Sequence, residues 1–328
     1  MAEMLVTKAT VVGSGAMGTV MAQVLAAGNV RVSLLARRES LVQELLTYRE
    51  NRTHLPGIKL SQHVFPTLDA RRAFANTEVV VSAVPCQHLR AAWEELAALV
   101  PAGVPVCSTT KGIEVESLLR PSQVLSQCLP GHDLAVLSGP SIALEVARCL
   151  PTTVVLASAD EALSQRLQAV FSASWFRIYT SGDPLGVELA GALKNVIALA
   201  AGILDGLNAG DNAKAALLTR GLVEITRLGV ALGAHERTFA GLAGIGDLIT
   251  TCISPLGRNR AAGERIGRGV PLADVLAECE GVVEGVPPSA GWIAAAGALP
   301  LALLPLLPLR TARSRIAGYA LCAAALWW

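Results

Sequence analysis

One lysine stands in the middle of a long apolar stretch, and its position suggests acid–base chemistry. Residues 186–205 have the pattern of a buried helix, and Lys194 is the only charged residue between Glu188 and Asp205. Asn195 follows it directly. Such a lysine either reaches water or faces a cleft, where desolvation brings its pKa toward the range for proton transfer near neutral pH. Lys194 is therefore a candidate catalytic residue; the alternative is a lysine at a surface kink of a core helix.

A glycine-rich loop near the N-terminus has the spacing of a dinucleotide-binding turn. Gly13, Gly15 and Gly18 form a G-x-G-x-x-G motif between an apolar run at 9–12 and a helical stretch at 19–28. The first glycine permits a tight turn, the second lets the backbone approach a pyrophosphate, and the third lets helix pack on strand. The motif predicts that NADP or NAD binds at the start of this helix. The alternative is a glycine-rich turn without a ligand.

Two arginines follow the second strand, where an acidic residue usually binds the ribose 2′-hydroxyl of NAD. Arg37 and Arg38 come directly after the apolar run at 30–35. Arginines suit the 2′-phosphate of NADP. We therefore expect NADP(H) to be used at least as well as NAD(H); the alternative is two solvated arginines at the end of a strand.

The elements that must position these residues divide the chain into an α/β part and a helical part. Strand-like runs, mostly separated by helical stretches, lie at 9–12, 30–35, 78–84, 104–108, 134–137, 153–156 and 176–179. This order predicts an α/β fold with an N-terminal Rossmann-type, mainly parallel sheet covered by helices on both faces. Helices are expected afterwards at 185–207, 212–232, 235–239, 258–268 and 271–280, which predicts a C-terminal all-helical domain. We expect a dinucleotide-binding domain over 1–184 and a helical substrate domain over 185–287.

The composition argues against several kinds of partner. The chain has 328 residues, a length that suits two domains, and 27 Lys+Arg against 26 Asp+Glu give a formal charge of +1. No bulk positive field therefore favours nucleic acid or an anionic membrane. The seven cysteines form no C-x-x-C pair, so we expect reduced thiols in a cytoplasmic protein, without disulfides or a metal site. A hydrophobic content of 52% with only 4% aromatics suits helices that pack through small residues.

Taken together, several segments resemble the bacterial NAD(P)-dependent glycerol-3-phosphate dehydrogenases. They are residues 13–18, 55–60, 110–114, 137–143, 188–195, 214–221, 241–248, 258–260 and 282–285. The Lys-Gly-Ile-Glu, Gly-Pro-Ser, Ala-Leu-Lys-Asn and Gly-Asp-Leu segments in this order are more specific than the glycine loop. The resemblance implies the interconversion of glycerol 3-phosphate and dihydroxyacetone phosphate, which serves phospholipid synthesis, and it suggests a homodimer.

The resemblance also implies roles for residues at matching positions. Lys194 matches the catalytic acid/base, and Lys111 matches a lysine that contacts both substrate and cofactor. Further substrate contacts are implied at Gly139, Ser141, Asn195, Asp247, Gly257, Arg258 and Asn259. Beyond the three glycines and Arg38, cofactor contacts are implied at Ala16, Met17, Arg37, Ala143, Arg258, Val282 and Glu284.

The chemistry of these side chains agrees with the implied roles. Hydride delivered to a ketone leaves an alkoxide, which the ammonium of Lys194 would stabilise and protonate. Arg258 and Asn259 suit a phosphate group. Asp247 would hold Lys194 charged or orient it, and it would also suit the N-cap of a helix over 247–252. For Lys111 the alternative is an ordinary exposed loop lysine.

Two features depart from the family pattern. Gly257 replaces a serine that is common in the family, which leaves only a backbone contact. After Glu284 there is no acidic residue, and residues 293–309 form an uncharged run that contains three prolines. We interpret the tail over 288–328 as translated out of the ancestral frame; the alternatives are a divergent folded tail and a membrane helix, and no stable membrane insertion is expected because prolines interrupt the run.

Two other functions stay open on the sequence. One is another two-domain NADP-dependent reductase, of the ketopantoate or pyrroline-5-carboxylate type, which shares the glycine loop. The other is a catalytically impaired NAD(P)-binding protein, which the unusual tail suggests.

Overall fold

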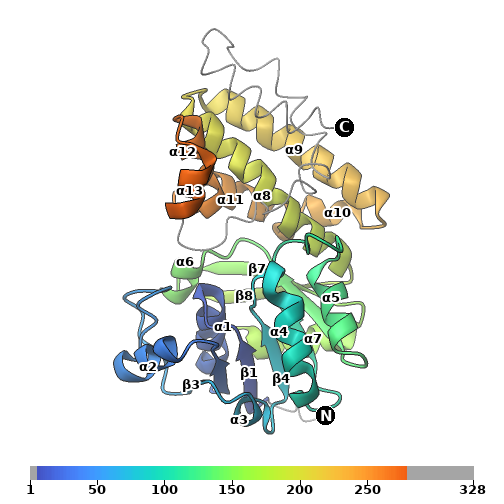
Figure 1. Ribbon diagram of the computed structural model, residues 1–328. Helices are drawn as coiled ribbons and strands as arrows, with labels where there is room; N and C mark the ends of the chain where they lie inside the picture. The colour runs from blue at the N-terminus through green and yellow to red at the C-terminus, as the bar shows by residue number, and fades with distance from the viewer. Residues whose placement is uncertain (1–5, 279–328) are drawn as a thin grey trace. The chain divides into compact units, whose positions relative to one another are not determined.

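The computed structural model describes residues 6–278, which fall into two compact units (Figure 1). Unit 1 contains the chain up to Glu114 together with Leu119–Glu188. Among the described residues, unit 2 contains Leu189–Glu278 together with the short segment Val115–Leu118. The tail over 288–328, for which we predicted a change of frame, lies outside the described residues.

Unit 1 is built on an eight-stranded sheet with the order β3-β2-β1-β4-β5-β6-β7-β8. The strands are β1 (Lys8–Val12), β2 (Arg31–Leu35), β3 (Val64–Thr67), β4 (Val79–Ser82), β5 (Val106–Ser108), β6 (Leu134–Ser138), β7 (Thr152–Ala157) and β8 (Phe176–Ser181). All neighbours pair in parallel except β6 and β7, which are antiparallel. The prediction of a mainly parallel Rossmann-type sheet is confirmed.

Helices cover both faces of this sheet. The core on one face joins α1 (Ala16–Ala27), α2 (Glu39–Tyr48), α6 (Ala143–Ala147) and α7 (Glu161–Phe171) to the strands. The core on the other face joins α3 (Ala70–Phe74), α4 (Leu89–Leu96) and α5 (Pro121–Cys128), with Trp93 fully buried at its centre. Because both faces are covered, the strands can be continuous apolar runs, which is why they were visible in the sequence.

Strand β3 is the one strand that the sequence analysis missed. It spans only Val64–Thr67 and contains Pro66, which lacks the N–H group that a central strand must donate. The strand lies at the end of the sheet order, where it pairs with β2 alone. An edge position tolerates proline, so Pro66, which made β3 hard to recognise in the sequence, is consistent with the edge position of the strand.

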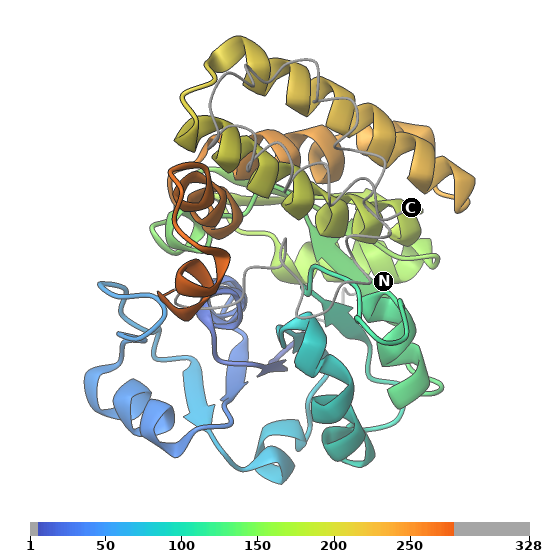
Figure 2. The ribbon, with the colours of Figure 1, turned by 45° about the horizontal axis from the view of Figure 1, so that its top comes forward.

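The regular structure of unit 2 between Leu189 and Glu278 is helical, as predicted. Helix α8 (Pro184–Gly206) begins in unit 1 and continues into unit 2, where it is followed by α9 (Asp211–Ala231), α10 (Glu236–Phe239), a π-helix (Leu242–Gly246), α11 (Asp247–Ile253), α12 (Arg258–Gly267) and α13 (Leu272–Glu278). Helices α8 and α9 run side by side in both views (Figures 1 and 2), and a Cβ on Gly221 would lie 2.4 Å from the Ile197 side chain.

Helices α8 and α12 touch backbone to backbone. A Cβ on Gly202 would lie 2.0 Å from the carbonyl oxygen of Arg260, and a Cβ on Gly206 would lie 2.2 Å from that of Glu264. Both partners advance by four residues, so the two helices run in the same direction. Glycines on α12 make the reciprocal contacts with α8. The expectation that helices pack through small residues is confirmed here.

One helix by itself, α8, is long and apolar enough to cross a membrane among residues 6–278. Its most apolar window has a mean hydropathy of 1.7, and 78% of that window is buried inside the structure. The burial accounts for the apolar composition, because α8 packs against other helices of the protein.

Candidate functional site

Lys194 is a buried cation held by two oxygens of one neighbouring helix. Only 6% of the residue is exposed, and its Nζ donates to Asp247 Oδ1 at 2.6 Å and to Thr251 Oγ1 at 2.6 Å. Both acceptors project from α11, where a spacing of four residues places them on one face. Burying a charge costs free energy unless the charge is paired, and the Asp247 carboxylate offsets that cost. Lys194 is therefore not a lysine at a surface kink.

The helix that carries Asp247 begins without a side-chain cap. The π-helix Leu242–Gly246 runs directly into α11, and Gly246 already has right-handed helical backbone angles. The predicted N-cap role of Asp247 is wrong because the chain is helical before this residue is reached. The carboxylate instead accepts the hydrogen bond from Lys194. Irregular π turns of this kind occur frequently at functional sites.

Thr251 is a site residue that the sequence analysis missed. Its hydroxyl accepts from Lys194 and donates to the carbonyl oxygen of Asp247 at 2.7 Å. The signal that would have found it is the spacing of four residues from Asp247 within one expected helix.

The start of α12 places Arg258 and Asn259 in the same unit as Lys194. Arg258 is exposed, whereas Asn259 is only 4% exposed. Gly202 of α8 packs against Arg260, the third residue of α12. Gly202 follows Lys194 by about two helical turns. At 1.5 Å per residue, the start of α12 lies on the order of 10 Å along α8 from Lys194. Asn195, also 4% exposed, lies on the same stretch of α8.

Gly257 occupies the N-cap position of α12 and has no room for a side chain. A Cβ there would lie 2.9 Å from the carbonyl oxygen of Thr251. Its N–H donates to Ser254 O at 3.1 Å, and its carbonyl accepts from Ala261 N at 2.9 Å. The departure from the common serine therefore matches the local packing, and the substrate contact at Gly257 stays a prediction.

The glycine loop of unit 1 has the shape that a dinucleotide requires. Gly13 has a φ of +103°, and a Cβ on Gly18 would lie 1.8 Å from the Gly13 carbonyl oxygen, so both positions need glycine. A Cβ on Gly15 would meet nothing within 4 Å, which leaves open space at the N-cap of α1. Ala16 and Met17 are the first residues of α1, where N–H groups have no partner within the helix. The loop therefore fits a pyrophosphate.

A buried asparagine ties this loop to the segment that follows α2. Asn51 is fully buried and donates from Nδ2 to Ser14 O at 2.9 Å and to Thr19 Oγ1 at 2.7 Å. Its Oδ1 accepts from the N–H of His54 at 3.1 Å. Asn51 was not predicted, because an isolated asparagine after a helix has no distinguishing pattern.

The two arginines after β2 are both exposed at the end of the strand. Arg37 follows the buried Ala36, and Nη2 of Arg38 lies 3.1 Å from Nε2 of His54. The His54 backbone also bonds Asn51, so Arg38 and the glycine loop share one supporting segment.

The loops after β5 and β6 meet around one carbonyl group. Lys111 Nζ donates to Gly139 O at 3.0 Å, and Ser141 Oγ donates to the same oxygen at 3.0 Å. Gly139 has a φ of +131°, and a Cβ there would lie 3.1 Å from Val154 Cα. Lys111 is half-buried, so the alternative of an exposed loop lysine is wrong. Ala143 follows as the first residue of α6.

The first turns of α8 are anchored by a buried carboxylate that the sequence analysis did not assign to a site. Glu188 accepts from Ser122 N at 2.7 Å and Ser122 Oγ at 2.6 Å, and it forms an ion pair with Arg120. Burial raises the pKa of the Glu188 carboxyl, and the Arg120 charge and the Ser122 hydrogen bonds oppose the shift. These contacts fix the start of the helix that carries Lys194.

The remaining predicted cofactor contacts, Val282 and Glu284, lie outside the described residues.

Comparison with known proteins gives a family match over most of the chain. A family model described as the N-terminus of NAD-dependent glycerol-3-phosphate dehydrogenase matches residues 8–164, and one described as its C-terminus matches residues 183–301. A glycerol-3-phosphate dehydrogenase (NAD(P)+) of Thermobifida fusca is 50% identical over 286 residues, which cover 85% of this chain and 84% of that protein.

Solved structures agree with the sequence match. The crystal structure of glycerol-3-phosphate dehydrogenase from Coxiella burnetii has a TM-score of 0.87 at 32% identity, covering 96% of this chain and 98% of that one. A ketopantoate reductase from Ralstonia eutropha has a TM-score of 0.52 at 16% identity, covering 97% of this chain and 98% of that one. The second likeness concerns the fold alone.

Proposed function

The chain belongs to the NAD-dependent glycerol-3-phosphate dehydrogenase family, and from that premise we infer that it interconverts sn-glycerol 3-phosphate and dihydroxyacetone phosphate with NAD(P)(H). The reaction supplies glycerol 3-phosphate for phospholipid synthesis. The observation that best supports this type of reaction is the buried Lys194 ammonium, which is held by Asp247 and Thr251. A buried donor of this kind is what the oxygen of a ketone needs as it gains an electron pair.

Lys194 acts as the general acid in ketone reduction and as the general base in the reverse direction. Its ammonium donates a hydrogen bond to the carbonyl oxygen and transfers a proton as negative charge develops there. Asp247 and Thr251 each accept one hydrogen bond from Nζ, and these two bonds fix the position of the ammonium. Two acceptors on one helix face also leave the ammonium few alternative positions.

Arg258 and Asn259 bind the substrate phosphate in this proposal. The guanidinium of Arg258 offers parallel donors to the dianion, and the Asn259 amide adds a neutral donor. Asn195, Lys111, Gly139, Ser141 and Gly257 are proposed as further substrate contacts. Binding energy from the phosphate then positions the ketone for reaction.

The cofactor is proposed to bind at the glycine loop, through Gly13, Gly15, Ala16, Met17 and Gly18. Further cofactor contacts are proposed for Arg37, Arg38, Lys111, Ala143, Arg258, Val282 and Glu284. When bound, the nicotinamide supplies or accepts the hydride. The open side of Gly15 and the N-terminus of α1 receive the pyrophosphate, and Asn51 holds the loop in shape.

The test is NADPH oxidation with dihydroxyacetone phosphate, assayed beside ketopantoate and pyrroline-5-carboxylate. We expect turnover with dihydroxyacetone phosphate alone. Lys194→Ala should lower turnover by several orders of magnitude while NADPH binding stays nearly intact, because the glycine loop belongs to unit 1. Lys214→Ala is the matched control, since Lys214 is another ion-paired lysine of the helical unit. Comparable turnover in Lys194→Ala would remove this residue from the mechanism.

Arg37 and Arg38 support the proposal that NADP(H) is used at least as well as NAD(H). The two guanidinium groups are exposed at the end of β2, where a 2′-phosphate would be received. Changing both to glutamine should raise the KM for NADPH and leave that for NADH nearly unchanged. A strong preference of the wild type for NADH would contradict this part of the proposal. We further propose that the protein is cytoplasmic and forms a homodimer. Sedimentation analysis of the purified chain would test the dimer.

A further inference from the structure

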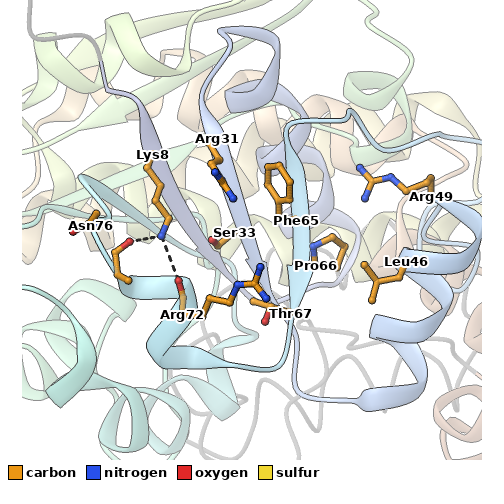
Figure 3. Close-up of a pocket in the computed structure, with 11 residues that line it drawn as sticks. Lys8, Arg31, Ser33, Leu46, Arg49, Phe65, Pro66, Thr67, Arg72 and Asn76 are labelled. Carbon is orange, nitrogen blue, oxygen red and sulfur yellow. Dashed lines mark hydrogen bonds between the residues drawn. The ribbon is translucent and has the colours of Figure 1, made fainter.

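A cavity of about 470 Å³ opens on unit 1 away from the glycine loop (Figure 3). Lys8 and Arg31, the first residues of β1 and β2, line it together with residues of β3, α2 and α3. The glycine loop instead follows Val12, at the other end of β1. At about 3.3 Å per residue, the two regions lie on the order of 13 Å apart along the strand. The end of the cavity at Lys8 and Arg31 is therefore separate from the glycine loop.

The cavity exists because helices cover one face of the sheet incompletely there. Val32 and Leu34 of β2 pack into the core beside α1, so Arg31 and Ser33 point to the opposite face. On that face the covering helix α3 has only five residues and buries Phe74 against the strands. Polar side chains line the part of β2 that α3 leaves uncovered.

Among residues 6–278, four cations and no carboxylate line the cavity: Lys8, Arg31, Arg49 and Arg72. None of them forms an ion pair within residues 6–278. Burial lowers the pKa of the Lys8 ammonium, and the charges of Arg31 and Arg72 lower it further. The cations therefore repel one another, and an anion among them would relieve that repulsion.

Most of these cations are held in place before any ligand arrives. Lys8 Nζ donates to the carbonyl of Arg72 at 3.3 Å and to a second carbonyl that follows α3. The guanidinium of Arg31 stacks 4.6 Å from the centroid of the Phe65 ring. Arg49 Nη2 donates to two backbone carbonyls, at 2.5 and 2.9 Å. A site with prearranged donors loses less conformational entropy when a ligand binds.

Two donors remain directed at the cavity. Within residues 6–278, the guanidinium of Arg72 and the hydroxyl of Ser33 make no hydrogen bond. Figure 3 shows the side chains of Lys8, Arg31 and Arg72 gathered around Ser33. Leu46 and Phe65 lie beside them and are 49% and 40% exposed, which gives the cavity an apolar side.

We propose that this cavity binds a small organic phosphate, either a phosphomonoester or a diphosphate, that also carries an apolar part. The phosphate oxygens accept hydrogen bonds from Arg31, Arg72 and the Ser33 hydroxyl, because planar guanidinium groups match phosphate oxygens. The apolar part contacts Leu46 and the exposed edge of Phe65. The cavity volume falls within the range of roughly 300–1,000 Å³ that is usual for small-molecule sites.

The test is an NMR titration of the full chain with pyrophosphate, read at the backbone amides of Ser33, Phe65 and Asn76, which line the cavity. Reading these amides separates binding here from binding at the glycine loop. We expect saturable shifts in the wild type and at least tenfold weaker binding in the double variant Arg31→Gln, Arg72→Gln. Arg71→Gln is the matched control, because it removes the same charge from α3 without lining the cavity. This control should stay within twofold of the wild type.

Several outcomes would overturn the proposal. One is the absence of saturable shifts at the three amides, and another is equal weakening in Arg71→Gln, which would indicate general electrostatics. If the double variant lacks the circular dichroism spectrum of the wild type, and so has not folded, the single variant Arg72→Gln replaces it. Sedimentation with vesicles of phosphatidylglycerol, abolished by Arg72→Gln but not displaced by pyrophosphate, would assign the site to lipid headgroups and contradict a soluble ligand.

Discussion

Thr251 is a neutral residue that would affect the reaction by positioning the side chain of Lys194. Its hydroxyl holds Nζ of Lys194 from one side while Asp247 holds it from the other. Thr251 is therefore a positioning residue, and its removal should leave Lys194 charged but less well directed. Because the hydroxyl also bonds the Asp247 carbonyl, it links the two acceptors on α11.

We predict that Thr251→Val lowers kcat by about tenfold to a hundredfold, since a hydrogen bond to a charged group contributes about 1.5–3 kcal/mol. The KM for dihydroxyacetone phosphate should change little, because the proposed phosphate contacts remain. Steady-state kinetics would check both values. Thr250→Val is the matched control: within residues 6–278, its hydroxyl bonds only a backbone oxygen, that of Gly246. Equal losses in the two variants would point to a helix defect and contradict the positioning role.

At the scale of elements, two glycines of the same loop are needed for different reasons. Gly18 is required by the contact between α1 and the loop itself, whereas Gly15 borders open space. The first demand concerns folding and the second concerns the ligand.

We predict opposite phenotypes for two alanine substitutions in this loop. Gly18→Ala places a methyl group 1.8 Å from the Gly13 carbonyl oxygen, so the free energy of unfolding should fall by roughly 3 kcal/mol or more. Gly15→Ala should keep the wild-type stability but weaken NADPH binding at least tenfold, because the methyl group fills the space beside the N-cap of α1. Denaturant titration and fluorescence titration measure the two effects. Unchanged NADPH affinity in Gly15→Ala would argue against pyrophosphate binding there.

The contact between α8 and α12 supports a further prediction, in which helix propensity and packing disagree. In an exposed helix, replacing glycine with alanine stabilises the helix by about 1 kcal/mol. Here the new methyl group would lie 2.0 Å from a backbone oxygen, and such overpacking costs about 1–3 kcal/mol or more. We expect net destabilisation in denaturant titration. Gly182→Ala, where nothing lies within 4 Å, is the control and should be neutral or slightly stabilising. A stabilised Gly202→Ala would show that the helices separate easily.

At the scale of the whole molecule, Glu188 links stability to pH. Its pKa in the folded protein is raised from the ordinary value of 4.5, chiefly by burial. The folded state therefore binds its proton more tightly than the unfolded state does. Stability from this group is fully present below pH 4.5 and is lost as the pH rises through the raised pKa.

We predict that Glu188→Gln removes this pH dependence. The unfolding free energy of the wild type minus that of Glu188→Gln should decrease as the pH rises from 4 to 8, because only the wild type must bury a negative charge. Denaturant titrations at several pH values provide the measurement. A difference that grows with pH would mean that the Arg120 pair outweighs burial and that the pKa is lowered.

The parts of the molecule that the sequence predicted are those governed by local pattern. The apolar runs of the parallel sheet and the glycine loop are continuous in sequence, so these elements can be recognised from the sequence alone. Contacts between distant segments left no such trace. Arg120 and Glu188 stand 68 residues apart, and nothing in either segment indicates their pairing. The predicted capping role of Asp247 was wrong for a different reason. The chain is already helical before Asp247, in an irregular π turn where Gly244 packs against the backbone of Phe239 five residues earlier.

The backbone contact between α8 and α12 also limits how this protein can be recombined with its relatives. A crossover placed between the two helices would join α8 of one parent to α12 of another. Gly202 and Gly206 pack against carbonyl oxygens of α12, and Gly263 and Gly267 pack against carbonyl oxygens of α8. A parent with alanine at any of these positions would give a chimera in which the two helices pack less closely. Functional hybrids should therefore inherit both helices from a single parent.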